Sequence, residues 1–211
     1  MQSHTCDLLL YPESLILRQG VRDSARTRHR VACRTAISEI EFSTDFERNI
    51  HYGGLTMAGA IEQKLAAQGI TLHEPASPVA NYVGFVRTGN LLFVSGQLCL
   101  DPEGNLIAKG KLGAGVTVEE GSAAACGCAL NLLAQVKAAL GDLDKVVRVV
   151  RLGGFVNSTP DFADGPKVLN GASDLMVAAF GDKGRHSRST VGVASLPADA
   201  AVEIEGLFEV A

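Results

Sequence analysis

Apolar residues in the middle of the chain recur at a spacing that predicts a long helix. The apolar positions of this segment are Ala125, Cys128, Leu132, Val136 and Ala139. They lie three or four residues apart, which places them on one face of a helix. Thr117 with Glu120 three residues later forms a capping-box pattern, and Gly141 supplies a terminating residue. The sequence therefore predicts a helix over residues 117–140.

Runs of β-branched and apolar residues predict strands on both sides of this helix. The predicted strands cover residues 82–87, 91–95, 145–156, 189–194 and 201–210, with a shorter one over 106–109. Thr88-Gly89-Asn90 joins the first two as a hairpin. Two further helices are expected over residues 58–67 and 166–180, each followed by a glycine. This order predicts an α+β fold in which two main helices cover one face of a mixed sheet.

The first 56 residues differ from the rest of the chain in composition and in pattern. They contain seven Arg, no Lys and seven acidic residues, and they show no sustained period. Their Arg-Ser-Thr-rich stretch over residues 18–35 is only a weak match to an organellar transit peptide. We expect residues 1–56 to be a poorly structured extension, which a start codon upstream of Met57 would explain. Residues 57–211 are expected to form the compact domain.

Composition and charge narrow the classes of function. Hydrophobic residues make up 46% of the chain and charged residues 20%, values typical of a globular protein rather than a disordered one. The 19 basic and 23 acidic side chains give a net charge of −4, so a broad basic surface for nucleic acid is not expected. The apolar runs are also shorter than the roughly 20 residues that a membrane-spanning helix needs. We therefore expect no nucleic-acid partner and no membrane partner.

The five cysteines favour a reducing compartment, and we expect the protein in the cytoplasm. Their number is odd, and they lack the paired spacing of zinc ligands. Cys126 and Cys128 fall inside the predicted long helix, where small packing residues are the simpler interpretation. No phosphate-binding loop, dinucleotide fingerprint or zinc-protease motif is present, so we expect no metal and no cofactor.

Two charged residues near the C-terminus are candidates for chemistry. Arg188 begins a predicted strand after a polar loop, where its guanidinium could hold a small carboxylate or phosphate, although most surface arginines are solvated or ion-paired. Glu203 alternates with Val202 and Ile204, so a carboxylate beside an apolar layer could orient or deprotonate water. The alternatives for Glu203 are the charged outer face of a sheet or an ion pair, and Glu205 on the same face is consistent with the charged face.

Other candidates have simpler explanations. Ser95 follows an apolar strand but lacks the preceding glycine of a nucleophile elbow. The pair Gly153-Gly154 is more typical of a bulge or a close backbone approach than of a phosphate cradle. His73 and His186 are too few and too far apart for a metal site, although His186 could contact a ligand near Arg188.

Four stretches between residues 78 and 210 together resemble one family. They are Asn81-Tyr82-Val83 with Gly89-Asn90-Leu91, Phe93-Val94-Ser95-Gly96-Gln97, residues 149–156 leading to Asp161-Phe162, and Arg188-Ser189-Thr190-Val191 with Leu196-Pro197 and Val202-Glu203-Ile204-Glu205. The sequence resembles the RidA (YjgF) family of reactive intermediate deaminases. The last stretch is the most specific part of the match. His186-Ser187 before Arg188 and Thr190 after it depart from the usual family pattern and indicate a divergent subgroup.

The resemblance implies a fold, an assembly and an activity. The fold would be chorismate-mutase-like, assembled as a homotrimer with ligand sites in the clefts between subunits. The activity would be cofactor-free hydrolysis of 2-imino and enamino acids of the 2-aminoacrylate type to 2-keto acids and ammonia. The alternatives are a non-catalytic trimer that binds small carboxylates or acts as a chaperone, and an endoribonuclease, for which the acidic net charge is poor support.

The resemblance also assigns roles to residues by position. Arg188 would bind the substrate carboxylate, Glu203 would hold the attacking water, and Tyr82 would line the cleft. Four further residues would contact the substrate: Ser95, Gly96, Asn170 and Thr190.

Overall fold

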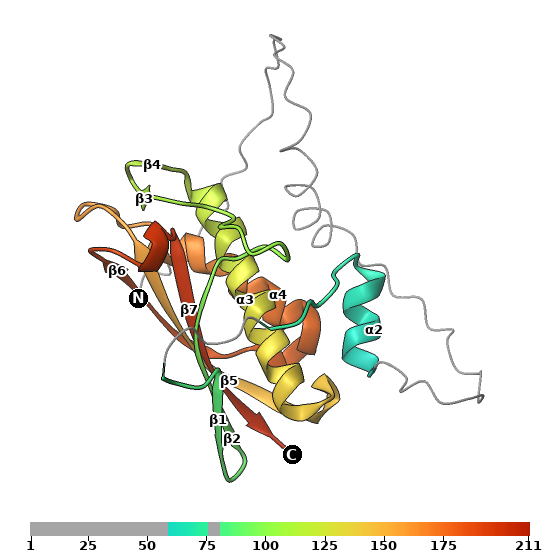
Figure 1. Ribbon diagram of the computed structural model, residues 1–211. Helices are drawn as coiled ribbons and strands as arrows, with labels where there is room; N and C mark the ends of the chain where they lie inside the picture. Colours follow the sequence, from blue (N-terminus) through green and yellow to red (C-terminus); the bar gives the residue numbers. More distant parts are fainter. Residues whose placement is uncertain (1–58, 76–80) are drawn as a thin grey trace, which may run out of the picture.

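A five-stranded sheet organises the part of the chain that the computed structural model describes, residues 59–75 and 81–211 (Figure 1). The strands are β1 (Phe85–Thr88), β2 (Leu91–Leu98), β5 (Val146–Asn157), β6 (Ser187–Val193) and β7 (Val202–Val210), with a separate short pair, β3 (Lys111–Leu112) and β4 (Gly115–Val116). The helices are α2 (Ala60–Ala67), α3 (Val118–Leu140) and α4 (Gly165–Phe180), with 3-10 turns η1 (Leu143–Lys145), η2 (Gly181–Gly184) and η3 (Pro197–Asp199). The expected extension over residues 1–56 lies outside the described residues.

The sheet is mixed, as the sequence predicts. Its strand order is β1-β2-β7-β5-β6. Neighbouring strands pair antiparallel except β5 and β6, which are parallel. A parallel pair needs a crossover connection, and α4 supplies it by returning the chain across the sheet from β5 to β6. This connection places α4 beside the edge strand β6.

Helices α3 and α4 pack side by side on one face of the sheet (Figure 1). The predicted cap of α3 is confirmed, because Thr117 Oγ1 accepts from Glu120 N at 3.1 Å and the Glu120 carboxylate accepts from Thr117 N at 3.1 Å. Gly141 ends the helix with φ 77°, a backbone conformation that glycine adopts readily. Among the described residues α3 is the one helix long and apolar enough to cross a membrane, yet 72% of its apolar window is buried inside this domain.

The core lies between the two helices and the sheet. Its largest fully buried side chains include Leu132, Leu133, Leu152, Leu169, Met176, Ile204 and Phe208. Cys126 and Cys128 are buried in α3, which confirms their interpretation as packing residues. A side chain on Gly154 would collide with Leu169 of α4, so this glycine permits the close helix–sheet approach that the sequence suggests.

The strand expected over residues 106–109 does not form. Leu106 and Lys109 make only isolated bridges, to Leu100 and Ala200. Gly110 follows with φ 103°, so the chain turns away before a ladder can extend. The other predicted elements are confirmed with end shifts of up to three residues, as at the start of β1, which is Phe85 rather than residue 82, and at the end of β2, which is Leu98 rather than residue 95.

Candidate functional site

Arg188 is held against α4 by two hydrogen bonds. Its Nη1 donates to Ser173 Oγ at 2.9 Å, and its Nη2 donates to the Pro166 carbonyl oxygen at 3.2 Å. The side chain is nevertheless exposed. A guanidinium carries five N–H groups in a rigid fork, so these two bonds fix its plane and leave donors for a ligand.

Asn170 and Thr190, which the sequence also predicts for the site, lie on the same side of β6 as Arg188. Pro166, Asn170 and Ser173 are spaced by four and three residues, so they share one face of α4, the face along which Arg188 extends. Asn170 is exposed there. Thr190 lies against the start of α4, because a Cβ built on Gly165 would be 3.2 Å from Thr190 Cγ2. We call Arg188, Asn170 and Thr190 the edge group.

A β-bulge shapes a second part of the site, on β2. Val94 pairs with Gly206 of β7, whereas Gln97 pairs with Ile204. Ser95 and Gly96 therefore stand opposite a single residue of β7, which is the arrangement of a bulge. Bulges turn side chains away from the regular pleat and are over-represented beside active sites.

Glu203 lies directly over this bulge. Its carboxylate occupies the space that a Cβ on Gly96 would fill, so only a glycine at position 96 permits the approach. The side chain of Glu203 is half-buried, and this loss of hydration is the larger of two causes that raise its pKa above the usual value. The negative charge of Glu205 is the smaller cause. A carboxyl group with a raised pKa is better suited to accept and return a proton near neutral pH than an ordinary surface glutamate.

Ser95 connects the bulge to the segment that precedes β1. Its Oγ donates to the Val83 carbonyl oxygen at 2.7 Å, and its backbone N donates to the Gly84 carbonyl oxygen at 2.9 Å. Tyr82 comes immediately before this anchored segment and is 53% exposed. We call Glu203, Ser95, Gly96 and Tyr82 the bulge group.

The edge group and the bulge group lie on opposite faces of the sheet. Arg188 points toward α4, on the face that the helices cover. Glu203 alternates with the fully buried Val202 and Ile204, so its side chain projects from the opposite face of the sheet, the open face, which no helix of the described residues covers. One strand, β5, separates β6 from β7, which places the two backbones about 10 Å apart. Within one chain, the described structure does not bring Arg188 and Glu203 together.

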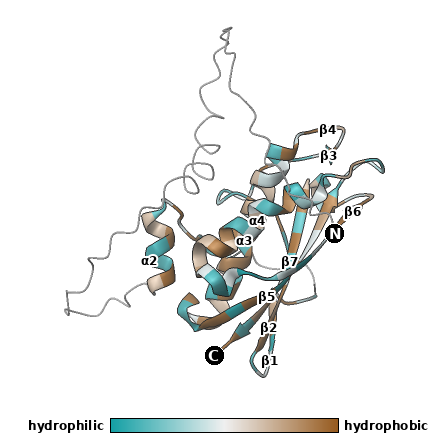
Figure 2. Cartoon of the chain, turned by 180° about the vertical axis from the view of Figure 1, so that it is seen from behind, coloured by the Kyte–Doolittle hydropathy of each residue, from teal (hydrophilic) through white to brown (hydrophobic). Residues whose placement is uncertain are grey.

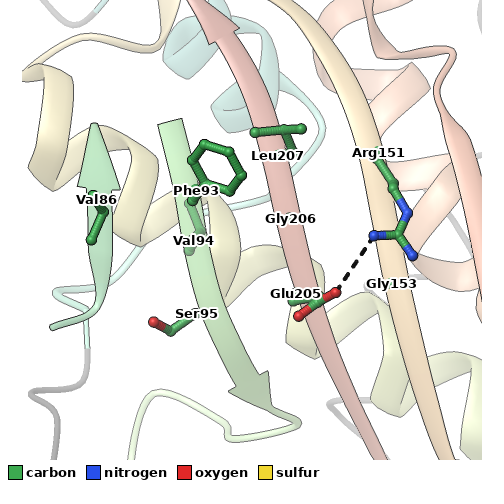
Figure 3. A pocket seen from close by; sticks show the side chains of 9 residues that line it. All are labelled: Val86, Phe93, Val94, Ser95, Arg151, Gly153, Glu205, Gly206 and Leu207. Carbon is green, nitrogen blue, oxygen red and sulfur yellow. Dashed lines mark ion pairs between the residues drawn. The ribbon is translucent and has the colours of Figure 1, made fainter. Parts of the chain in front are cut away.

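The open face of the sheet carries a shallow pocket of about 260 Å³. Its lining residues are Val86, Phe93, Val94, Ser95, Arg151, Gly153, Glu205, Gly206 and Leu207 (Figure 3). In this view the helices lie behind the strands, and Arg151 Nη1 forms an ion pair with Glu205 Oε1 at 3.9 Å. Ser95 is the member of the bulge group that reaches the pocket.

Large apolar side chains remain exposed on this open face. Val86 is 54% exposed, Phe93 46% and Val191 48%. Val191 is in line with Glu203 across the sheet, because both pair with Phe155. Figure 2 shows the strands from the opposite side, with apolar residues along β1, β2, β5 and β7. Exposed apolar side chains that gather on one face are typical of an interaction surface.

Three carboxylates outside both groups could in principle bind a cation. Ligand atoms of Glu62, Asp142 and Asp144 lie within 4.8 Å of one another. Asp144 already accepts from Ala60 N at 2.8 Å and from Ile61 N at 2.9 Å, so it caps the N-terminus of α2. Its observed role is therefore to fasten α2 to η1.

Sequence reasoning missed Ser173 and left His186 as an isolated possibility. Ser173 Oγ lies 3.1 Å from His186 Nε2, and His186 Nδ1 lies 2.6 Å from the Gly184 carbonyl oxygen. A signal for Ser173 was present in the sequence, since it falls on the same helical face as Asn170. What the sequence alone does not supply is the packing of that face against Arg188.

The fold and the two residue groups define a class, an α+β domain with one helix-covered and one open sheet face. Residues 62–208 match the family described as "YjgF/chorismate mutase-like, putative endoribonuclease". Protein TCP17 of Trypanosoma cruzi is 50% identical over 153 residues, covering 72% of this chain and 95% of that protein. RutC family protein y4sK of Sinorhizobium fredii is 32% identical, covering 66% and 94%. The crystal structure of Atu1372 from Agrobacterium tumefaciens, a protein of unknown function, has a TM-score of 0.66 at 48% identity, covering 72% and 93%.

This chain belongs to the YjgF/RidA family, and its domain has the chorismate-mutase-like fold of that family. The family match begins within α2 and ends within β7. It also includes all seven residues that the sequence predicts for the site.

Proposed function

We propose that this protein hydrolyses reactive 2-imino and enamino acids to 2-keto acids and ammonia, without a cofactor. Arg188 grips the substrate carboxylate, and Glu203 directs water onto the C=N carbon. The observation that carries this proposal is the exposed guanidinium of Arg188, which two hydrogen bonds to α4 hold in a fixed plane. A fixed fork with free donors matches a small carboxylate.

The chemistry needs little beyond positioning and one proton acceptor. In the protonated imine the carbon is already electrophilic, so the water oxygen attacks it and the C=N electron pair moves to nitrogen. Glu203 takes a proton from the attacking water. Glu203 then passes this proton to the nitrogen, and the tetrahedral adduct loses ammonia with the C–N electron pair. The hydroxyl proton returns to Glu203 and is released to solvent, which leaves the 2-keto acid. An enamino acid enters this sequence after a proton adds to its carbon and gives the imine.

We further propose that the working site lies between two copies of the chain in a homotrimer. In one chain, the side chains of Arg188 and Glu203 project from opposite faces of the sheet. A single copy therefore cannot place both side chains against one substrate. The exposed apolar side chains Val86, Phe93 and Val191 lie on the same open face as Glu203. Burying this face against a neighbouring copy would bring the neighbour's edge strand toward the bulge group.

The test is protection of an unstable imine. An amino acid oxidase generates 2-iminopropanoate, and semicarbazide traps whatever imine remains free. The protein is expected to lower the initial rate of semicarbazone formation and to raise the rate of ammonia release, whereas Arg188→Ala has neither effect. Arg185→Ala is the matched control, because Arg185 is exposed in the same loop and forms an ion pair with Asp182 rather than with α4 within the described part of the chain. A wild-type rate equal to spontaneous decay contradicts the proposal.

The same preparation separates the proposal from its alternatives. Binding of a 2-keto acid through Arg188 without any turnover supports a non-catalytic binding protein instead. The family description names an endoribonuclease, so a labelled RNA is incubated in parallel. RNA cleavage that is retained through further purification and lost in Arg188→Ala would support that activity over the deaminase.

A further inference from the structure

We infer that Ser173 and His186 are positioning residues that set the orientation of Arg188. This inference rests on the proposed function, since it concerns the same anchor for the substrate carboxylate. Three side chains and one backbone carbonyl form a continuous series of hydrogen bonds that links β6, α4 and η2. The series runs from Arg188 Nη1 to Ser173 Oγ at 2.9 Å, to His186 Nε2 at 3.1 Å, and from His186 Nδ1 to the Gly184 oxygen at 2.6 Å.

The Gly184 carbonyl sets the direction of this series. A carbonyl oxygen only accepts, so His186 Nδ1 must carry a proton. In the neutral ring His186 Nε2 then has a lone pair and accepts the hydroxyl proton of Ser173. With its proton committed to His186, the Ser173 oxygen presents its lone pairs to Arg188. Each donor therefore meets an acceptor, and the hydroxyl has one satisfied orientation.

The surroundings of His186 favour this neutral form. Burial of the ring is the largest cause and lowers the pKa of His186, the hydrogen bond to Gly184 opposes it, and the positive charge of Arg188 lowers the pKa further. The pKa of His186 therefore lies below its usual value. Gly184 itself is fixed, because a Cβ there would collide with the Met176 carbonyl of α4. The acceptor that orients His186 is thus tied to the same helix that carries Ser173.

The consequence for Arg188 is a pre-set plane of the guanidinium. A long, exposed side chain loses rotamer freedom when it grips a ligand, and that loss weakens binding. Two bonds to α4, at Ser173 and at Pro166, restrict this freedom before the substrate arrives. The carboxylate is present throughout the reaction, so a looser Arg188 should weaken ground state and transition state alike.

The first test needs no substrate. Nitrogen NMR of the full-length protein, with the His186 signals assigned through His186→Gln, is expected to show a protonated Nδ1 and an unprotonated Nε2. Ser173→Ala removes the donor to Nε2 and should shift the Nε2 signal while leaving Nδ1 protonated. A His186 ring protonated at Nε2 instead would overturn the inference, because Ser173 could not then be oriented toward Arg188 as described.

The second test separates positioning from general damage. Ser173→Ala is expected to raise KM about tenfold and to weaken binding of pyruvate by the same factor, with kcat within about twofold of the wild-type value. Ser173→Thr keeps the hydroxyl and should restore KM to within about threefold. Asp174→Ala is the matched control, since Asp174 is the next residue of α4 and is exposed. Unchanged KM and unchanged pyruvate affinity in folded Ser173→Ala would overturn the inference.

The two proposals fail in different ways. If the wild-type protein shows no turnover but Ser173→Ala still weakens pyruvate binding, the deaminase proposal fails and the positioning role stands. If turnover is confirmed and Arg188→Ala abolishes it while Ser173→Ala has no effect, the positioning role fails and the deaminase proposal stands. Circular dichroism of each variant identifies any that do not fold, and His186→Ala, which removes the acceptor of the Ser173 hydroxyl, then replaces Ser173→Ala in the comparison with wild type.

Discussion

The edge group and the bulge group are built by different physical means. Arg188 in the edge group is oriented by hydrogen bonds that its own side chain donates to α4. Glu203 in the bulge group is placed by the backbone, because the bulge at Ser95 and Gly96 leaves room for its carboxylate. The cation is thus fixed by explicit partners, and the carboxyl group is fixed by the shape of the strand beneath it.

One chain by itself does not complete the proposed site. The guanidinium lies on the helix-covered side of the edge strand, and the carboxyl group lies on the open side. Each half is organised within its own chain, so assembly would only need to bring two finished halves together. Disrupting the edge group should therefore cost substrate binding, whereas disrupting the bulge group should cost the chemical step.

The largest effect is expected from loss of the guanidinium. Arg188→Ala should lower kcat/KM at least about a hundredfold, because the substrate carboxylate loses a charged, bidentate partner. Arg188→Lys keeps the charge but loses the planar fork of N–H donors, so kcat/KM of this variant should lie between those of wild type and Arg188→Ala, about tenfold below wild type. Steady-state kinetics with enzymatically generated 2-iminopropanoate measure both values. Equal activity in all three proteins would remove Arg188 from the site.

An intermediate effect is expected from filling the bulge. Gly96→Ala places a methyl group where the Glu203 carboxylate lies, so the carboxylate must move and kcat should fall about tenfold. Stability should change by less than about 1 kcal/mol, because the displaced group is the flexible end of a side chain. Gly153→Ala is the matched change on the same face, since its methyl group would meet Glu205 instead. A similar loss of kcat in both variants would show that Glu203 is not the group that matters.

The smallest effect concerns stability rather than rate. Burial raises the pKa of Glu203 in the folded state, so folding favours its protonated form. That advantage is complete below the unfolded pKa and is lost as the pH rises through the folded pKa. Glu203→Gln should therefore stabilise the protein at pH 7, by less than about 1 kcal/mol because the group is half exposed to solvent.

Chemical denaturation at two pH values checks this sign. The stabilisation by Glu203→Gln should be measurable near pH 7 and absent near pH 4. Glu209→Gln serves for comparison, because Glu209 lies on the same strand and points to the same face. A gain that is larger at pH 4 than at pH 7 would contradict the electrostatic description of the bulge group.

Local patterns in the sequence predicted most of the fold. The capping box at Thr117 and Glu120 and the glycine at position 141 defined α3, because caps depend on neighbouring residues alone. The prediction of a strand over residues 106–109 was wrong, because a short apolar run does not reveal whether a sheet edge is available to pair with it. Strand pairing is a long-range property that a local pattern does not contain.

The site was predictable as a set of residues but not as an arrangement. Alternation in β7 correctly placed Glu203 opposite the buried Val202 and Ile204. The sequence did not show the bulge at Ser95 and Gly96, because a bulge depends on the register of the partner strand. Nor did it show that Arg188 points to α4, because β6 acquires its helix-facing side only when the crossover is formed.

In the proposed homotrimer, Arg188 of one copy acts with Glu203 of another. Arg188→Ala and Glu203→Gln are each expected to abolish most of the activity when prepared alone. Subunits of the two variants are then mixed in equal amounts under conditions that exchange subunits, and the imine hydrolysis rate is measured. In a randomly mixed homotrimer about a quarter of the sites combine an intact Arg188 with an intact Glu203 from the adjacent copy.

A site shared between copies predicts that this mixture recovers about a quarter of the wild-type rate, although neither variant is active alone. A site built within one chain predicts no recovery, because no subunit in the mixture carries both residues. Mixed oligomers that are verified by native mass spectrometry and remain as inactive as the separate variants would rule out a site shared between copies.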